Sequence, residues 1–265
     1  LIACSSRLQF LATISSENVQ HLFLPAIISL ALINGIGLAV LFHRYFKIPL
    51  SFNLPEKESL RKVWTFSRLA LLTNLISFFA LRIDYWILAA YSGRSVSADS
   101  LGNYIQISKM YQAFLLMPNI IATVVFPVTA SGDVVHIRKK ILVLLQWVLA
   151  GSSAAVLLLS ITGQWLFPMV FGEQYHYLYS CYLASMAGIV SLSLISVLAA
   201  YFSGINQLKY NLGGSILALG LVTLFNFILV PQLGINGAAW ADSIGYFSYL
   251  CFLLYFFRKK THPTP

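Results

Sequence analysis

Charged residues are scarce in this chain. Asp, Glu, Lys and Arg make up 9% of its 265 residues, whereas an ordinary soluble domain contains about 25%. Hydrophobic residues make up 58%, which is typical of a polytopic membrane protein. Alternating ten-residue segments, the mark of a membrane barrel, are absent. The composition therefore predicts an all-α bundle of transmembrane helices.

Cysteine and histidine are also few, and they are dispersed. Cys4, Cys181 and Cys251 lie too far apart for a disulfide framework, and no group of His and Cys has the spacing of metal ligands. The sequence contains no Walker loop, no GxSxG motif and no plausible pair of catalytic carboxylates. We therefore expect a protein that is not an enzyme, with no catalytic residues, no cofactor and no metal.

Acidic residues are outnumbered by basic ones, which gives a net charge of +9. The placement of the bases decides what this excess means. Seven apolar runs, each near the length of a spanning helix, cover about 20–42, 66–91, 101–130, 141–163, 177–200, 210–230 and 236–257. Bases gather after the first, third, fifth and seventh runs: Arg44, Lys47, Lys57, Arg61 and Lys62; Arg138, Lys139 and Lys140; Lys209; and Arg258, Lys259 and Lys260.

This alternation follows the positive-inside rule. It predicts a multi-pass membrane protein with a cytoplasmic C-terminus and no nucleic-acid partner. Seven spans that end inside place Leu1 outside, yet residues 1–19 make a poor signal peptide and the chain lacks an initiator Met. We therefore expect the C-terminal part of a longer protein, with an odd number of spans upstream.

The run 66–91 is unusual because it contains Arg68, Arg82 and Asp84. Ionisable groups in hydrocarbon cost several kcal/mol unless they are paired or hydrated. On one continuous helix, Arg68 and Arg82 would lie within roughly 40° of each other, with Thr73, Ser77 and Asp84 in a stripe on nearly the opposite side. The pattern predicts a helix packed among others beside a water-filled cavity.

Two further charged residues lie inside predicted spans. Lys109 has a depth similar to that of Arg82 and Asp84. It forms an ion pair with Asp84 that fastens two helices, extends its ammonium group to the membrane surface as a snorkelling lysine, or takes part in transport. Asp242 lies just inside the last span. It is either a proton or cation site or a hydrogen-bonded buried carboxylate. Pro118 and Pro127 predict a bend in the third span.

Several short motifs follow one another along the chain. They are Arg82-Ile-Asp84-Tyr, Gly102-Asn-Tyr104, Phe171-Gly172-Glu-Gln-Tyr175, Gly204-Ile-Asn206-Gln207, and Asn226 followed by Val230-Pro231 and Gly234-Ile-Asn-Gly237-Ala-Ala. The ordered set resembles the polysaccharide-biosynthesis flippases, typified by the O-antigen flippase, of the multidrug/oligosaccharidyl-lipid/polysaccharide exporter superfamily.

The resemblance implies a twelve-helix, two-lobed MATE-like fold, of which this chain holds the last seven helices. Residues 1–42 would be the last helix of the N-lobe with the external segment before it. Residues 43–65, whose part from Pro55 to Trp64 has the pattern of a short amphipathic surface helix, would be the cytoplasmic linker between the lobes. Residues 66–260 would form the six-helix C-lobe and 261–265 a cytoplasmic tail.

The resemblance also implies a location in the bacterial cytoplasmic (inner) membrane, and a function. Similar proteins move an undecaprenyl-pyrophosphate-linked oligosaccharide across the bilayer by alternating access, for O-antigen or other surface polysaccharide, beside polysaccharide polymerase and assembly proteins. Arg82, with Arg68 and Lys109, would line the cavity and bind the pyrophosphate, because arginine offers a planar, permanently charged fork. Asp84 or Asp242 would couple transport to an ion gradient.

Three other functions stay open at this point. A multidrug exporter of the same superfamily would carry cationic drugs, and its cavity should contain mainly acidic side chains. The predicted span interiors here contain three bases and two acids. A peptidoglycan-precursor flippase differs mainly in cargo. A non-transporting scaffold for a glycan-assembly complex would confine its polar residues to helix contacts and have no continuous cavity.

Overall fold

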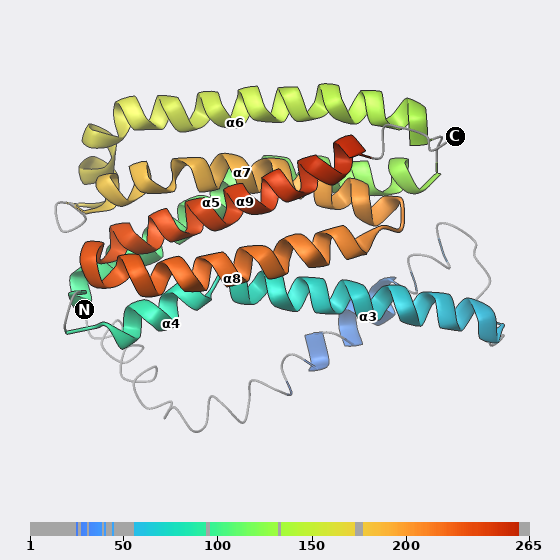
Figure 1. Ribbon diagram of the computed structural model, residues 1–265. Coiled ribbons are helices and arrows are strands. Elements are labelled where there is room, and N and C mark those ends of the chain that lie inside the picture. Colours follow the sequence, from blue (N-terminus) through green and yellow to red (C-terminus); the bar gives the residue numbers. More distant parts are fainter. Residues whose placement is uncertain are drawn as a thin grey trace. The chain divides into compact units, whose positions relative to one another are not determined.

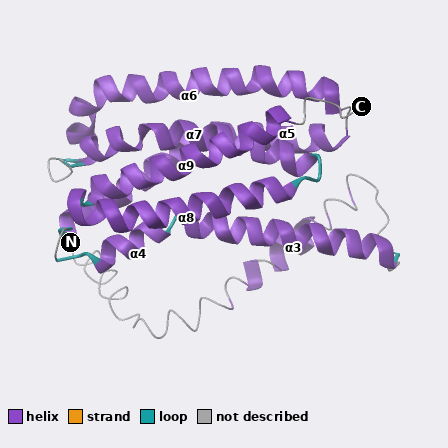
Figure 2. Cartoon of the chain, in the orientation of Figure 1, coloured by secondary structure: helices purple, strands orange, loops and turns teal. Residues whose placement is uncertain are grey.

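Helices dominate the described part of the chain. The computed structural model describes residues 56–93, 96–131, 134–172 and 177–259, together with a few residues between 25 and 44. Its helices are α3 (Lys57–Ala80), α4 (Ile83–Ala90), α5 (Ala98–Ser131), α6 (Val134–Phe171), α7 (Leu178–Gly204), α8 (Leu208–Leu233) and α9 (Ile235–Lys259) (Figure 1). The described residues form no strand beyond one isolated bridge between Ser92 and Val96 (Figure 2). The all-α prediction is confirmed for them.

Five stretches of helix are long and apolar enough to cross a membrane: Lys57–Ala90, Ser100–Ser131, Ile137–Phe171, Leu178–Gly204 and Leu208–Leu233. Each contains most or all of one predicted run, from 66–91 to 210–230. Helix α9 covers the last predicted run but is less apolar, because Asp242 and several tyrosines interrupt it. The first predicted span, the linker as far as residue 55, the 261–265 tail and the middle of the Phe171–Tyr175 motif lie largely or wholly outside the described residues.

The chain divides into two compact units, Leu1–Lys57 and Glu58–Pro265. The division falls inside the predicted 43–65 linker.

Helix α3 differs from the prediction at both ends. The predicted surface helix near residues 55–64 and the span after it form one helix, because neither Pro nor Gly interrupts the sequence between Lys57 and Ala80. The ion pair between Lys62 Nζ and Glu58 Oε1, 2.8 Å apart, lies on its first turns. The expected continuous helix over 66–91 is wrong, because α3 ends at Ala80 and α4 begins at Ile83. The predicted angle between Arg68 and Arg82 does not apply across this break.

The break between α3 and α4 frees a backbone carbonyl inside the span. Leu81 and Arg82 form a turn, and the Tyr246 hydroxyl of α9 donates a hydrogen bond of 3.2 Å to the Ala80 carbonyl. A broken helix is tolerated in hydrocarbon where a neighbouring side chain satisfies the freed group. The contact therefore stabilises the break and ties it to α9.

Helix α7 is the centre of the bundle. It lies between α6 and α9 and also packs along α5, and α8 packs along α9 (Figure 1). Small residues allow these close approaches. Gly188 of α7 faces Tyr111 and Ser243, and a Cβ on Gly237 of α9 would overlap the Leu229 carbonyl of α8. The buried core is thickest around α7.

The glycines of Gly234-Ile-Asn-Gly237 predict a tight turn between the last two runs, and in the structure α8 and α9 are linked by a single residue. Gly234 has φ of 58° and ends α8, so its conformation favours glycine. Gly237, which the sequence predicts to supply backbone freedom in the same turn, lies inside α9 instead. Its role is to allow the close approach to α8.

A Gly237→Ala substitution should therefore destabilise the protein by about 1–3 kcal/mol, because the added methyl group overpacks the α8–α9 contact. Gly220→Ala in α8 is the matched control, since a Cβ there meets nothing within 4 Å. The control should be neutral or stabilising by up to about 1 kcal/mol. Denaturant unfolding of the purified protein in detergent measures both, and equal stability of the two variants would contradict the packing argument.

Candidate functional site

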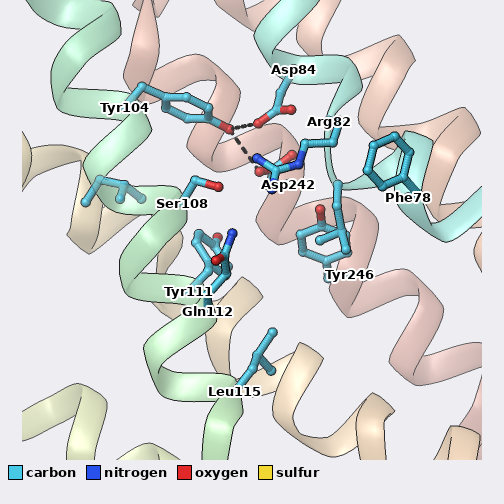
Figure 3. A pocket seen from close by; sticks show the side chains of 12 residues that line it. Phe78, Arg82, Asp84, Tyr104, Ser108, Tyr111, Gln112, Leu115, Asp242 and Tyr246 are labelled. Carbon is cyan, nitrogen blue, oxygen red and sulfur yellow. Dashed lines mark hydrogen bonds between the residues drawn. The ribbon is translucent and has the colours of Figure 1, made fainter. Parts of the chain in front are cut away.

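Three polar side chains meet where α4, α5 and α9 converge (Figure 3). The Tyr104 hydroxyl of α5 donates a hydrogen bond to Oδ2 of Asp84 in α4, and it lies 3.0 Å from Oδ2 of Asp242 in α9. Asp84 and Tyr104 are each 2% exposed, and Asp242 is 6% exposed. The helix break makes this meeting possible, because Asp84 lies in the first turn of the separate helix α4.

The two carboxyl groups compete for one hydroxyl. A tyrosine carries a single O–H proton, so one proton cannot serve both acids fully. The other oxygens, Oδ1 of Asp84 and Oδ1 of Asp242, are buried and have no hydrogen-bond partner among the described residues. Two close carboxylates repel each other unless a proton or a cation lies between them. The cluster can therefore accept a proton or hold a small cation.

Arg82 lies beside this cluster. Its guanidinium carbon is 5.3 Å from the centroid of the Tyr85 ring, a cation–π distance, and its side chain is half-buried. Within the described ranges, Lys62–Glu58 is the one salt bridge, so Arg82 is near the acids without pairing directly with either. Its charge still offsets part of theirs.

The surrounding carboxylate pocket is small, with a volume of about 130 Å³. This volume suits an ion or a few water molecules. Its lining is Phe78, Leu81, Arg82, Asp84, Tyr104, Ile107, Ser108, Tyr111, Gln112, Leu115, Asp242 and Tyr246. Of the five charged residues predicted to act in the spans, the structure brings three together here: Arg82, Asp84 and Asp242.

The other two predicted site residues lie elsewhere. Arg68 on α3 and Lys109 on α5 are exposed, and neither lines the carboxylate pocket. The predicted Asp84–Lys109 ion pair is wrong, since Asp84 contacts Tyr104 instead. Tyr104 and Lys109 are five residues apart, so they point about 140° away from each other on one helix.

A much larger cavity adjoins this pocket. This cavity, the polar cavity, has a volume of about 860 Å³. Residues of α3, α5, α7, α8 and α9 border it, and none of its lining residues is charged. Its polar members are uncharged: Thr73, Asn74, Ser77, Asn119, Thr123, Ser196, Ser203, Asn211, Ser215, Tyr246 and Tyr249. Leu81, Leu115 and Tyr246 line both hollows, so the two meet at the helix break.

Sequence reasoning found part of this lining. Thr73 and Ser77, which the sequence placed in one polar stripe, both line the polar cavity, and Asp84 of the same stripe lines the carboxylate pocket. The roles of Tyr104 and Tyr246 were missed. A tyrosine in a spanning helix is common near the interface, so its sequence position carried no signal of a buried hydroxyl.

The shared hydroxyl makes a prediction about coupling between residues. In a double-mutant cycle, Asp84→Asn and Tyr104→Phe should show a coupling energy of about 1–3 kcal/mol, because each removes the partner of a buried polar group. Asp84→Asn with Tyr255→Phe is the matched control, since Tyr255 is exposed on α9. Denaturant unfolding measures the four corners of each cycle. Additive effects in the first cycle would contradict the contact.

Comparison of the chain with protein-family models, with curated proteins and with solved structures gave no match. The resemblance to polysaccharide flippases therefore stays a prediction, and the argument for function rests on the geometry of the two adjoining cavities.

Proposed function

We propose that this chain is part of a flippase that moves a lipid-linked oligosaccharide across the cytoplasmic membrane by alternating access. The observation that carries the proposal is the large polar cavity, an open hollow between the helices whose hydroxyl and amide groups lie among apolar side chains and which adjoins a buried pair of carboxyl groups. A scaffold would need only polar contacts between helices. A cavity of this size argues for cargo.

The chemistry of the polar cavity suits a glycan. Its hydroxyl and amide groups can donate to and accept from sugar hydroxyls, and its volume of about 860 Å³ lies in the range of small-molecule sites. Its lining has no charged side chain, so a large polar group can enter without displacing water from fixed, unpaired ions. The prenyl tail of such a substrate would remain in the surrounding lipid.

The carboxylate pocket suits energy coupling. At about 130 Å³ it is too small for a sugar, but its two buried acids can exchange a proton or a monovalent cation. Asp84 and Asp242 come from different helices, so binding there would change how α4 and α9 hold together. Transport that is insensitive to collapse of both proton and sodium gradients would contradict this role.

One observation favours the rival function, a multidrug exporter for cations. The carboxylate pocket contains two acids and one base, because Arg68 and Lys109 lie outside it. The excess of bases that favoured an anionic substrate therefore does not hold within this pocket. The uncharged lining of the polar cavity keeps the oligosaccharide as the better-supported cargo, and a peptidoglycan-precursor flippase would use the same cavity.

Filling the polar cavity should stop transport. Thr123→Trp in the full-length protein, in a bacterial strain that lacks the chromosomal copy, should reduce surface polysaccharide at least tenfold at normal protein abundance, because the indole enters the cavity. Val124→Trp is the matched control, since Val124 is the next residue of α5, is exposed and does not line the cavity. Equal polysaccharide in the two strains would sink the proposal.

The charge of Arg82 separates the two cargo classes. If the cargo carries a pyrophosphate, Arg82→Gln should abolish surface polysaccharide while the protein remains abundant, because Arg82 is the base of the pocket that adjoins the polar cavity and its guanidinium would attract the headgroup from there. If the cargo is a cationic drug, polysaccharide should persist and Asp242→Asn should reduce ethidium efflux instead. Both assays run on the same strains.

A further inference from the structure

A second pocket lies beside the first turns of α3, away from the carboxylate cluster. This basic pocket has a volume of about 500 Å³. Its lining is Glu58, Arg61, Lys62, Thr65, Phe66 and Leu69 of α3, together with Asn206 and Leu208 where α7 passes into α8. It belongs to none of the functions assigned above. We propose that it binds the phosphate of an anionic phospholipid at the membrane surface that the sequence predicts to be cytoplasmic.

The charge of the pocket matches a single phosphodiester. Two bases and one acid line it, and the acid is taken by the Lys62–Glu58 ion pair of 2.8 Å. No other salt bridge occurs among residues 56–93, 96–131, 134–172 and 177–259, so the Arg61 guanidinium is left without an acid. One excess positive charge complements a phosphodiester, which carries one negative charge. A pyrophosphate would carry about two.

The start of α8 adds hydrogen-bond donors on the other side of the pocket. The first backbone N–H groups of a helix lack acceptors within the helix, and the N-cap residue Gln207 makes no side-chain hydrogen bond to them. Leu208, the first residue of α8, lines the pocket, and Asn206 before it has φ of 57°. A phosphate between Arg61 and this helix end would meet a guanidinium and peptide N–H groups.

The depth of the pocket fits a lipid. Trp64, two residues from Lys62, is 66% exposed, and tryptophan at that exposure on a spanning helix is typical of the headgroup level. Phe66 and Leu69 follow, so the lining changes from basic to apolar between Arg61 and Leu69, about 12 Å along the helix. A phospholipid has the same order, with phosphate above and acyl chains below.

The basic pocket also meets the polar cavity, because Phe66 and Leu208 line both. A phospholipid held there would lie at the cavity mouth. The inference does not depend on the proposed transport reaction, since it requires only the pocket and the membrane surface beside it.

The test is binding of a fluorescent short-chain phosphatidylglycerol to the purified full-length protein in detergent, with phosphatidylcholine as the neutral comparison. Arg61→Gln should weaken phosphatidylglycerol binding about fivefold, and Arg61→Lys should largely restore it, because a single surface charge contributes about that factor. Lys259→Gln is the matched control, since Lys259 is exposed on α9 and does not line the pocket. Arg61 is itself exposed, so a single symmetrical peak in size-exclusion chromatography is expected for every variant.

Three results would overturn the inference. The first is equal affinity of wild type and Arg61→Gln, and the second is an equal loss in Lys259→Gln, which would mean a diffuse attraction between charges. The third is displacement of phosphatidylglycerol by a lower concentration of farnesyl pyrophosphate, with the same dependence on Arg61, which would make the pocket a cargo site. Failure of the transport proposal is distinguishable, because Thr123→Trp tests transport and leaves the basic pocket unchanged.

Discussion

A backbone carbonyl inside a membrane needs a hydrogen-bond donor, and the described structure depends on how this chain meets that requirement at Ala80. Helix α3 ends there, and the Tyr246 hydroxyl of α9 supplies the donor. Ala80 is buried, and an unsatisfied carbonyl there would cost several kcal/mol. One side chain of the last helix thus stabilises the break in the first spanning stretch of this unit.

The break determines where charge lies. Because α4 begins as a separate helix at Ile83, Asp84 does not lie on a face continuous with α3. Its carboxyl group instead shares the Tyr104 hydroxyl with Asp242. The acids and Arg82 are then concentrated in a small pocket, while the larger cavity beside it is uncharged. In the proposed flippase, an ion site separate from the cargo site would let each have the polarity it needs: strong local charge for the ion, and dispersed hydroxyl and amide groups for a glycan.

The basic pocket, the polar cavity and the carboxylate pocket adjoin one another in that order. The basic pocket and the polar cavity share Phe66 and Leu208, and the polar cavity and the carboxylate pocket share Leu81, Leu115 and Tyr246. Polarity along the series passes from basic, through uncharged, to acidic. The charge that each cavity can accommodate therefore changes from one end of the series to the other.

The sequence by itself determined the helices, because apolar runs of spanning length leave few alternatives in lipid. It also pointed to Arg82, Asp84 and Asp242, since ionisable residues are costly in such runs. Only the tertiary structure decided which of them meet. Tyr104 and Asp242 are 138 residues apart in the chain, and Arg68 and Lys109 are exposed and do not line the pocket. Periodicity along one helix shows which residues share a face, but the packing of the other helices decides what that face contacts.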